Sequence, residues 1–140
     1  MVLPSPVVPM AETALIDAAA VDLGQSLHDL MARAGAALAD EAERMAGDGE
    51  ILIATGPGNN GGDGWVAAEL LAERGQHVAL WPVREPTTTL AIAAAERARR
   101  TVEVLARPED DRPALIVDCL LGAGVTGELR AWAREAVETL

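Results

Sequence analysis

Short apolar runs alternate with longer amphipathic stretches along most of the chain. The runs at 51–55, 77–81, 102–105 and 114–117 are short and rich in Ile, Leu and Val, which is typical of buried strands. Apolar residues recur at helical spacing over 10–21, 27–45, 65–73, 89–100 and from about 128 to 140, and these stretches are predicted to be helices. Because strands and helices alternate, we expect an α/β fold: a Rossmann-like three-layer sandwich with a mostly parallel sheet and helices on both faces.

The length of the chain, 140 residues, suits one domain with a core of its own. Residues 1–9 contain three prolines and are expected to form a flexible N-terminal arm, so the domain is expected to span 10–140. Ser26 is placed to cap the helix that starts at Leu27, with Asp29 in its first turn.

The charge of the chain narrows the choice of partners. Eleven Arg and no Lys stand against 22 acidic residues, which gives a net charge of -11 and argues against nucleic acid and anionic membrane surfaces. The lack of Lys also excludes a phosphate-binding or Schiff-base lysine. No apolar run approaches about 18 residues, so no membrane span is expected. Cys119 is the only cysteine, which excludes an internal disulfide and fits a reducing compartment such as the cytoplasm.

The richest local pattern is G-P-G-N-N-G-G-D-G-W at 56–65, directly after a predicted strand. Five glycines in nine residues favour close approach of the backbone to a ligand, and the start of the helix predicted from Trp65 offers N–H groups to an anion. Pro57 and Asp63 argue against the usual dinucleotide loop, although G-x-G-x-x-G is satisfied. Asn59 and Asn60 add amide groups that can serve a substrate or a cation. A tight turn capped by Asp63 is the alternative interpretation.

A second polar pattern begins at Asp118, which ends a predicted strand and precedes G-A-G-V-T-G at 122–127. Carboxyl ends of parallel strands line one rim of a sheet, where ligands bind. An Asp carboxylate and an Asn carbonyl are hard oxygen ligands and suit an alkali or alkaline-earth cation. The alternative is that Asp118 only orders its own loop. Cys119 is interpreted as a packed residue rather than a nucleophile, and Trp65 either packs beneath a ligand or holds the helix to the sheet.

Three stretches together resemble one protein family: G-P-G-N-N-G-G-D-G-W-V-A-A (56–68), V-D-C-L-L-G-A-G-V-T-G (117–127) and L-H-D-L-M-A-R-A-G-A-A (27–37). They are similar to the NAD(P)H-hydrate epimerase family, the YjeF N-terminal-type domain. The resemblance implies an isomerase that interconverts the R and S forms of hydrated NADH and NADPH and binds potassium. It also implies a homodimer and a separate or fused ADP/ATP-dependent dehydratase that restores the S form.

The resemblance also implies roles for particular residues. Asn60 and Asp118 would be potassium ligands. The implied substrate-binding residues are Asn59, Asn60, Gly61, Gly62, Asp63, Gly122, Ala123, Gly124, Val125, Thr126, Gly127 and Glu128. In the family a further strand follows and ends in an Asp-x-Pro-Ser-Gly-like motif that supplies an acid. We therefore expect the C-terminal part of the domain and the catalytic acid to lie beyond Leu140, as in a fragment of a longer protein, and the catalytic residue stays unassigned.

Two alternatives remain open at this stage. The chain could be a conventional NAD(P)-binding Rossmann domain, which should bind intact NAD(H) tightly without potassium. It could also be a non-catalytic binding module of the same family, which should bind the hydrate without turning it over. Whether the 140 residues alone catalyse epimerisation is left to the turnover assay.

Overall fold

A computed structural model of the chain describes residues 8–108 and 112–140. The elements, in chain order, are α1 (Met10–Asp22), α2 (Leu27–Ala46), β1 (Ile51–Thr55), α3 (Asn59–Glu73), β2 (Val78–Pro82), α4 (Thr89–Ala98), β3 (Glu103–Val104), β4 (Leu115–Cys119) and α5 (Ala131–Thr139). Most of the arm expected at 1–9 lies outside the described residues, which begin at position 8.

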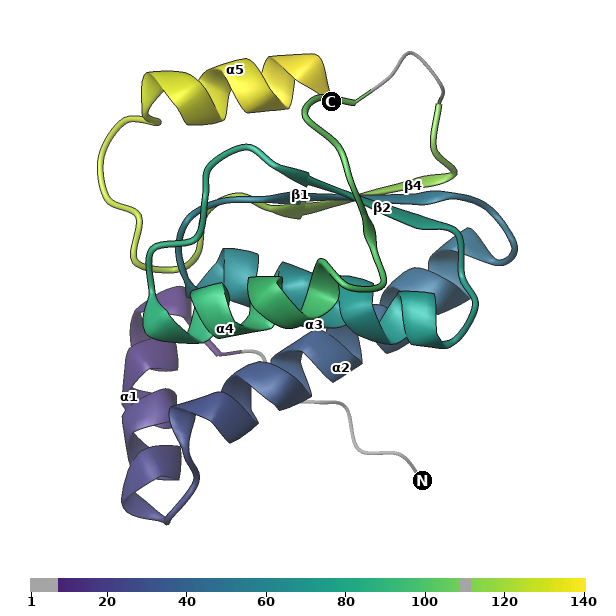
Figure 1. Cartoon of the computed structure of the whole chain (residues 1–140). Coiled ribbons are helices and arrows are strands. Elements are labelled where there is room, and N and C mark those ends of the chain that lie inside the picture. Colours follow the sequence, from purple (N-terminus) through teal and green to yellow (C-terminus); the bar gives the residue numbers. More distant parts are fainter. Residues whose placement is uncertain (1–7, 109–111) are drawn as a thin grey trace.

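The strands form one parallel sheet in the order β3-β2-β1-β4. Figure 1 shows α2, α3 and α4 on one face of this sheet and α5 on the other. The predicted three-layer α/β sandwich is therefore confirmed. Among the described residues β4 pairs only with β1, so its outer side forms an edge of the sheet, and Ile116 on this strand is 39% exposed.

The sheet separates two apolar clusters. The larger one fills the space between the sheet and α2, α3 and α4, and its largest fully buried side chains include Trp65, Ile51 and Ile53. The smaller one lies under α5, where Leu52, Trp81 and other residues pack together. Alternate residues of β1 thus serve opposite faces, as the two-residue period of a strand requires.

The start of α2 forms as the sequence predicts. The Asp29 N–H donates to the Ser26 hydroxyl at 3.0 Å, and the Asp29 carboxylate accepts from the Ser26 backbone N–H, so a reciprocal capping box is present. The Ser26 hydroxyl also donates to the Asp29 carboxylate at 2.7 Å, and this hydrogen bond, followed by the one from the Ser26 backbone N–H, is the main reason why the pKa of Asp29 is lowered.

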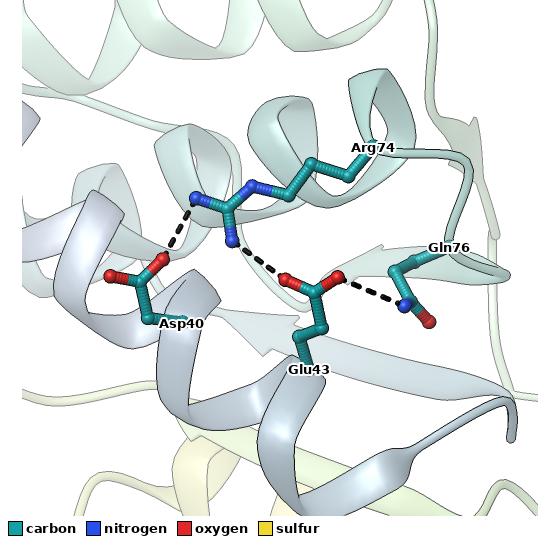
Figure 2. A network of polar contacts seen from close by, with 4 residues as sticks. All are labelled: Asp40, Glu43, Arg74 and Gln76. Atoms are coloured by element: carbon teal, nitrogen blue, oxygen red, sulfur yellow. Dashed lines mark hydrogen bonds and ion pairs between the residues drawn. The ribbon is translucent and has the colours of Figure 1, made fainter.

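A polar network holds the other end of α2 against the end of α3 (Figure 2). The guanidinium of Arg74 contacts Asp40 and Glu43, each at 2.8 Å, and Glu43 also accepts from the Gln76 amide at 3.2 Å. Arg74 is the C-cap residue of α3, while both acids belong to α2. The network therefore helps to hold these two helices where they cross.

By contrast, α1 is weakly covered and lies outside α2 (Figure 1). Several apolar side chains here face solvent: Leu15 is 69% exposed, Leu23 87% and Leu27, at the start of α2, 55%. In residues 8–108 and 112–140, no helix has both the length and the apolar character needed to cross a bilayer.

Two predicted helix boundaries were wrong. Helix α3 begins at Asn59 instead of Trp65, so most of the glycine-rich pattern is helical. Asn and Gly have low helix propensity, and tertiary packing of the small residues overrides it. Helix α5 begins at Ala131, because residues 122–130 are exposed turns.

Candidate functional site

The ends of β1 and β4 form the point where the chain changes direction through the sheet. From β1 the chain proceeds outward to β2 and β3, and then returns to β4 on the other side of β1. Ligands of open α/β sheets bind at such a switch point, beyond the carboxyl ends of the strands. Both glycine-rich patterns lie there: the first segment, 56–64, follows β1, and the second segment, 120–128, follows β4.

The glycines of the first segment are required by contacts within the protein. A Cβ on Gly61 would lie 2.0 Å from the backbone oxygen of Gly56, and one on Gly62 would lie 2.5 Å from the Met31 side chain. A Cβ on Gly64 would lie 2.9 Å from Thr55 and 3.0 Å from Cys119. Side chains are thus excluded because α3 starts close against β1, β4 and α2, which replaces the ligand-approach explanation for these positions.

Gly58 differs from the other glycines of this segment. It is the N-cap residue of α3, its backbone is extended, and a Cβ built on it meets nothing within 4 Å. The N–H groups of the first turn of α3 are therefore reached from the side of Gly58. This is the part of the first segment where a phosphate can approach a helix start.

The two glycine-rich segments contact each other directly. The Asn60 amide donates to the backbone oxygen of Leu121 at 3.1 Å, and the Gly56 N–H donates to that of Cys119 at 3.0 Å. A Cβ on Gly56 would lie 1.9 Å from the Leu120 oxygen. The second segment consequently lies immediately against the first, as the sequence predicts.

Asp118 lies at the end of β4, in register with Ala54, and is exposed. Its Oδ1 accepts from the Leu120 N–H at 2.9 Å, so the loop-ordering role weighed from the sequence is present. The exposure of the residue leaves the other carboxylate oxygen available to a ligand. Asn60 donates through its nitrogen, which leaves its oxygen as an acceptor.

Asn59 and Asp63 project differently from Asn60. Asn59 accepts at 2.7 Å from the hydroxyl of Thr88, the N-cap residue of α4. Asn59 and Asp63 both line a small cavity of about 150 Å³, to which Asp17 and Met31 also contribute. Of the predicted substrate-binding residues at 59–63, Asn60 therefore meets the second segment, whereas Asn59 and Asp63 line a cavity beside α1 and α2.

Burial changes the acidity of two groups here. Desolvation is the main cause that raises the pKa of Asp63 to about 6, and the negative charge of Asp17 adds to it. Burial also raises the pKa of the Cys119 thiol to about 12, with smaller contributions from Asp63 and Asp118. Cys119 is 2% exposed, which supports its interpretation as a packed residue rather than a nucleophile.

The second segment beyond Leu121 is exposed from residue 122 to 130. Gly122 lies beside Asn60, at 3.2 Å between a built Cβ and the Asn60 Cβ, whereas a Cβ on Gly124 meets nothing within 4 Å. Gly127 has a φ of 82°, a conformation that favours glycine. The predicted contacts of residues 122–128 with a substrate stay a prediction.

Two polar atoms beneath the site have no hydrogen-bond partner among the residues that the structure describes. The Thr55 hydroxyl and the Trp65 indole nitrogen are buried without a hydrogen bond. Trp65 is fully buried in the larger core cluster, with the Arg99 guanidinium 5.0 Å from its ring centroid, so it holds the helix to the sheet. In the part of the chain that the structure describes, no three His, Cys, Asp or Glu side chains form a metal-binding group.

Sequence reasoning missed three contributors to the site. Thr88, whose hydroxyl caps α4, also contacts Asn59. The Leu121 backbone oxygen and the Asp17 carboxylate come from distant parts of the chain. Nothing in the local pattern signals these contacts, because they depend on how α1 and the second segment pack.

The fold and the site define a doubly wound α/β protein with a glycine-rich candidate ligand site at its switch point. Residues 27–140 match the protein family described as YjeF-related protein N-terminus. The chain therefore belongs to this family, and the resemblance stated from the sequence is confirmed.

Several similar proteins are named as NAD(P)H-hydrate epimerase or repair enzymes. A bifunctional NAD(P)H-hydrate repair enzyme Nnr of Hyperthermus butylicus is 35% identical, and the match covers 92% of this chain and 26% of that protein. An NAD(P)H-hydrate epimerase of Bordetella pertussis is 40% identical, over 74% of this chain and 47% of that protein. The crystal structure of yeast YNL200c has a TM-score of 0.80 at 26% identity and matches 96% of this chain and 64% of that one. The chain thus spans between a quarter and a half of these curated relatives.

Proposed function

We propose that this chain belongs to an enzyme that interconverts the R and S forms of hydrated NADH and NADPH. The observation that carries the proposal is the contact between the first and second glycine-rich segments at the switch point, where Asn60 donates to Leu121. Relatives that are similar over most of this chain are named as NAD(P)H-hydrate epimerase or repair enzymes.

The geometry supports binding of a dinucleotide with its diphosphate at the start of α3 and its hydrated ring end at the second segment. The start of α3 carries unpaired N–H groups beside Gly58, which suit the diphosphate. The exposed residues 122–128 lie next to Asn60 and suit the hydrated ring end. The overall charge of -11 makes such local donors necessary for an anionic ligand.

The proposal includes a potassium ion held by Asn60 and Asp118. Each residue has one free oxygen, which is a hard ligand. Asn60 lies at the start of α3, which follows β1, and Asp118 lies near the end of the neighbouring strand β4. When bound there, the ion would add positive charge close to the anionic substrate. Asp118 orders the second segment through the Leu120 N–H, and Asn60 links that segment to α3.

The test measures turnover of the purified R hydrate of NADPH or NADH. A dehydratase that accepts only the S form reports product as restored, fluorescent cofactor. We expect a longer chain that includes the predicted C-terminal acid to give a signal above spontaneous epimerisation, which falls when potassium is replaced by choline; the 140 residues alone are measured beside it. Asp118→Ala should lose potassium dependence, while Asp22→Ala on exposed α1 serves as the matched control.

Other outcomes would point to the alternatives. Tight, potassium-independent binding of intact NAD(H) without turnover would indicate a conventional nucleotide-binding domain. Hydrate binding without turnover would indicate a non-catalytic module. Either result in the longer chain would overturn the proposed activity.

We also propose that the chain forms a homodimer and acts with a dehydratase, fused or separate. The exposed apolar side chains of α1 and the start of α2, Leu15, Leu23 and Leu27, offer a surface for a second copy. Sedimentation analysis tests the dimer, and Leu15→Asp should shift the protein toward monomer. A monomer at all concentrations in the original chain would refute the dimer without touching the activity.

A further inference from the structure

A second cavity lies beside the site, between α5 and the ends of β2 and β3. Its volume is about 250 Å³. Trp81 comes from β2, Arg84 follows β2, Arg107 follows β3, and Trp132, Glu135 and Ala136 come from α5. None of these residues belongs to the two glycine-rich segments.

The cavity carries an unusual charge for this chain. Among the described residues that line it, Arg84 and Arg107 are positive and Glu135 is negative, in a protein whose net charge is -11. Both arginines are exposed. Arg84 makes no ion pair with another described residue. Its guanidinium is thus available to a phosphate, which it can bind in a bidentate manner.

The cavity also offers aromatic surface. The Arg84 guanidinium lies 6.0 Å from the centroid of the Trp132 ring, and Trp132 is half-buried while Trp81 is 7% exposed. A flat heterocycle can stack on a tryptophan face, and a neighbouring arginine strengthens such a site. The combination of indole rings and guanidinium groups suits an aromatic base that carries a phosphate.

The cavity adjoins the first glycine-rich segment through the residues that follow β2. Thr55 and Pro82 are in register, and the Val83 N–H donates to the Thr55 oxygen at 3.0 Å. The Thr87 N–H donates to the Pro57 oxygen at 2.9 Å. Arg84 therefore follows β2, the strand beside β1, and neighbouring strands of a sheet lie about 4.8 Å apart. In doubly wound folds the adenosine end of a dinucleotide lies near the end of this second strand.

The acid that could serve a ribose hydroxyl here is already engaged. In such folds an acid near the end of the second strand binds the ribose of NAD, whereas an arginine accommodates the 2′-phosphate of NADP. Glu85 is the acid in this position, and its carboxylate accepts from the Arg99 guanidinium at 2.7 Å. Arg84 is the neighbouring residue that stays available.

We propose that the cavity formed by Arg84, Arg107 and Trp132 binds the adenosine 2′-phosphate end of the substrate, so that NADPH hydrate is preferred over NADH hydrate. The inference rests on the proposed function, because it assigns the distal end of the same substrate. The adenine ring stacks on Trp132, and the phosphate lies between the two guanidinium groups.

The test measures direct binding of 2′,5′-ADP and of 5′-AMP. Calorimetry and quenching of tryptophan fluorescence report the affinity of each nucleotide. We expect 2′,5′-ADP to bind at least about tenfold more tightly than 5′-AMP, since a charge-assisted contact is added. Arg84→Ala should remove most of this difference, and Arg84→Lys should keep part of it. Arg100→Ala, at an exposed arginine after α4, is the matched control and should change nothing.

Competition connects the cavity with the substrate. NADPH hydrate should displace bound 2′,5′-ADP, and Trp132→Leu should weaken both ligands while circular dichroism stays unchanged. Equal binding of the two nucleotides, equal effects of Arg84→Ala and Arg100→Ala, or simultaneous binding of NADPH hydrate and 2′,5′-ADP would overturn the inference. Absence of epimerisation would refute only the proposed function, because none of these binding measurements needs turnover.

Discussion

Gly61 shows how little space is left at the start of α3. A Cβ here would lie 2.0 Å from the Gly56 backbone oxygen, and no flexible side chain can move aside. Gly58, three residues earlier, has open space around it and an extended backbone that any residue adopts. Packing thus explains why glycine stands at position 61, but it does not explain the glycine at position 58 of the same motif.

We expect Gly61→Ala to lower the free energy of unfolding by about 1–3 kcal/mol, as overpacking does in a rigid site. Gly58→Ala should stay within about 0.5 kcal/mol of the original chain. Urea denaturation followed by circular dichroism measures both. Equal stabilities of the two variants would contradict the packing explanation.

Asp63 is a half-buried acid whose ionisation opposes folding. Its pKa of about 6 in the folded chain lies above the ordinary 3.8, because burial and Asp17 disfavour the charged form. The folded state thus binds the proton more tightly, and stability falls as the pH rises from about 4 through 6. Above this window the full penalty remains.

Asp63→Asn should therefore stabilise the chain at pH 7, by about 1 kcal/mol once solvent screening of this half-buried group is allowed for. The gain should vanish near pH 4, where the original carboxyl is protonated. Glu96→Gln on an exposed position of α4 is the control. Unfolding curves at both pH values decide, and a pH-independent difference would argue against this cause.

Between elements, the crossing of α2 and α3 is held partly by the network around Arg74 (Figure 2). Arg74→Met keeps much of the side-chain volume but removes its contacts with Asp40 and Glu43. We expect a lower midpoint of thermal unfolding, with a deficit that shrinks in concentrated salt because the lost attraction is screened. Arg100→Met is the control, and a deficit that is the same at all salt concentrations would refute an electrostatic origin.

The strands and their parallel arrangement were predictable because they are written in local pattern. The run from Ile51 to Thr55 is apolar throughout and buried throughout, and Ser26 with Asp29 marks a helix start within four residues. Such signals need no knowledge of distant partners. The beginning of α3 was not predictable, since Asn59 and Gly61 are helical only through their packing.

The candidate site was predictable in its position but not in its internal division. Glycines and an Asp after two apolar runs place both segments at one rim of a parallel sheet. Local pattern could not separate Asn60, which meets Leu121, from Asn59, which meets Thr88. Nor could local pattern bring together Arg84 and Trp132. They are 48 positions apart and line one cavity because of where α5 packs.

Across the whole molecule, charge and topology act together on the ligand. The chain repels anions overall, with a net charge of -11, so the proposed dinucleotide substrate would depend on a few positive positions. These are the start of α3 and the cavity with Arg84 and Arg107. Both lie beyond the ends of neighbouring strands, so one extended ligand can cross from one to the other.

We expect the outer side of β4, which has no neighbouring strand among the described residues and carries Ile116 at 39% exposure, to affect how this 140-residue chain behaves when it is concentrated. Backbone groups of an edge strand are a template for self-association of further copies into aggregates. Mutual repulsion of molecules with a charge of -11 delays such encounters in dilute buffer. We expect turbidity to develop as sodium chloride is added, since the screening length falls from about 30 Å at 0.01 M to about 10 Å at 0.1 M. Ile116→Lys should suppress this turbidity more than Val137→Lys on α5. Equal suppression by the two variants would mean that the copies associate through another surface.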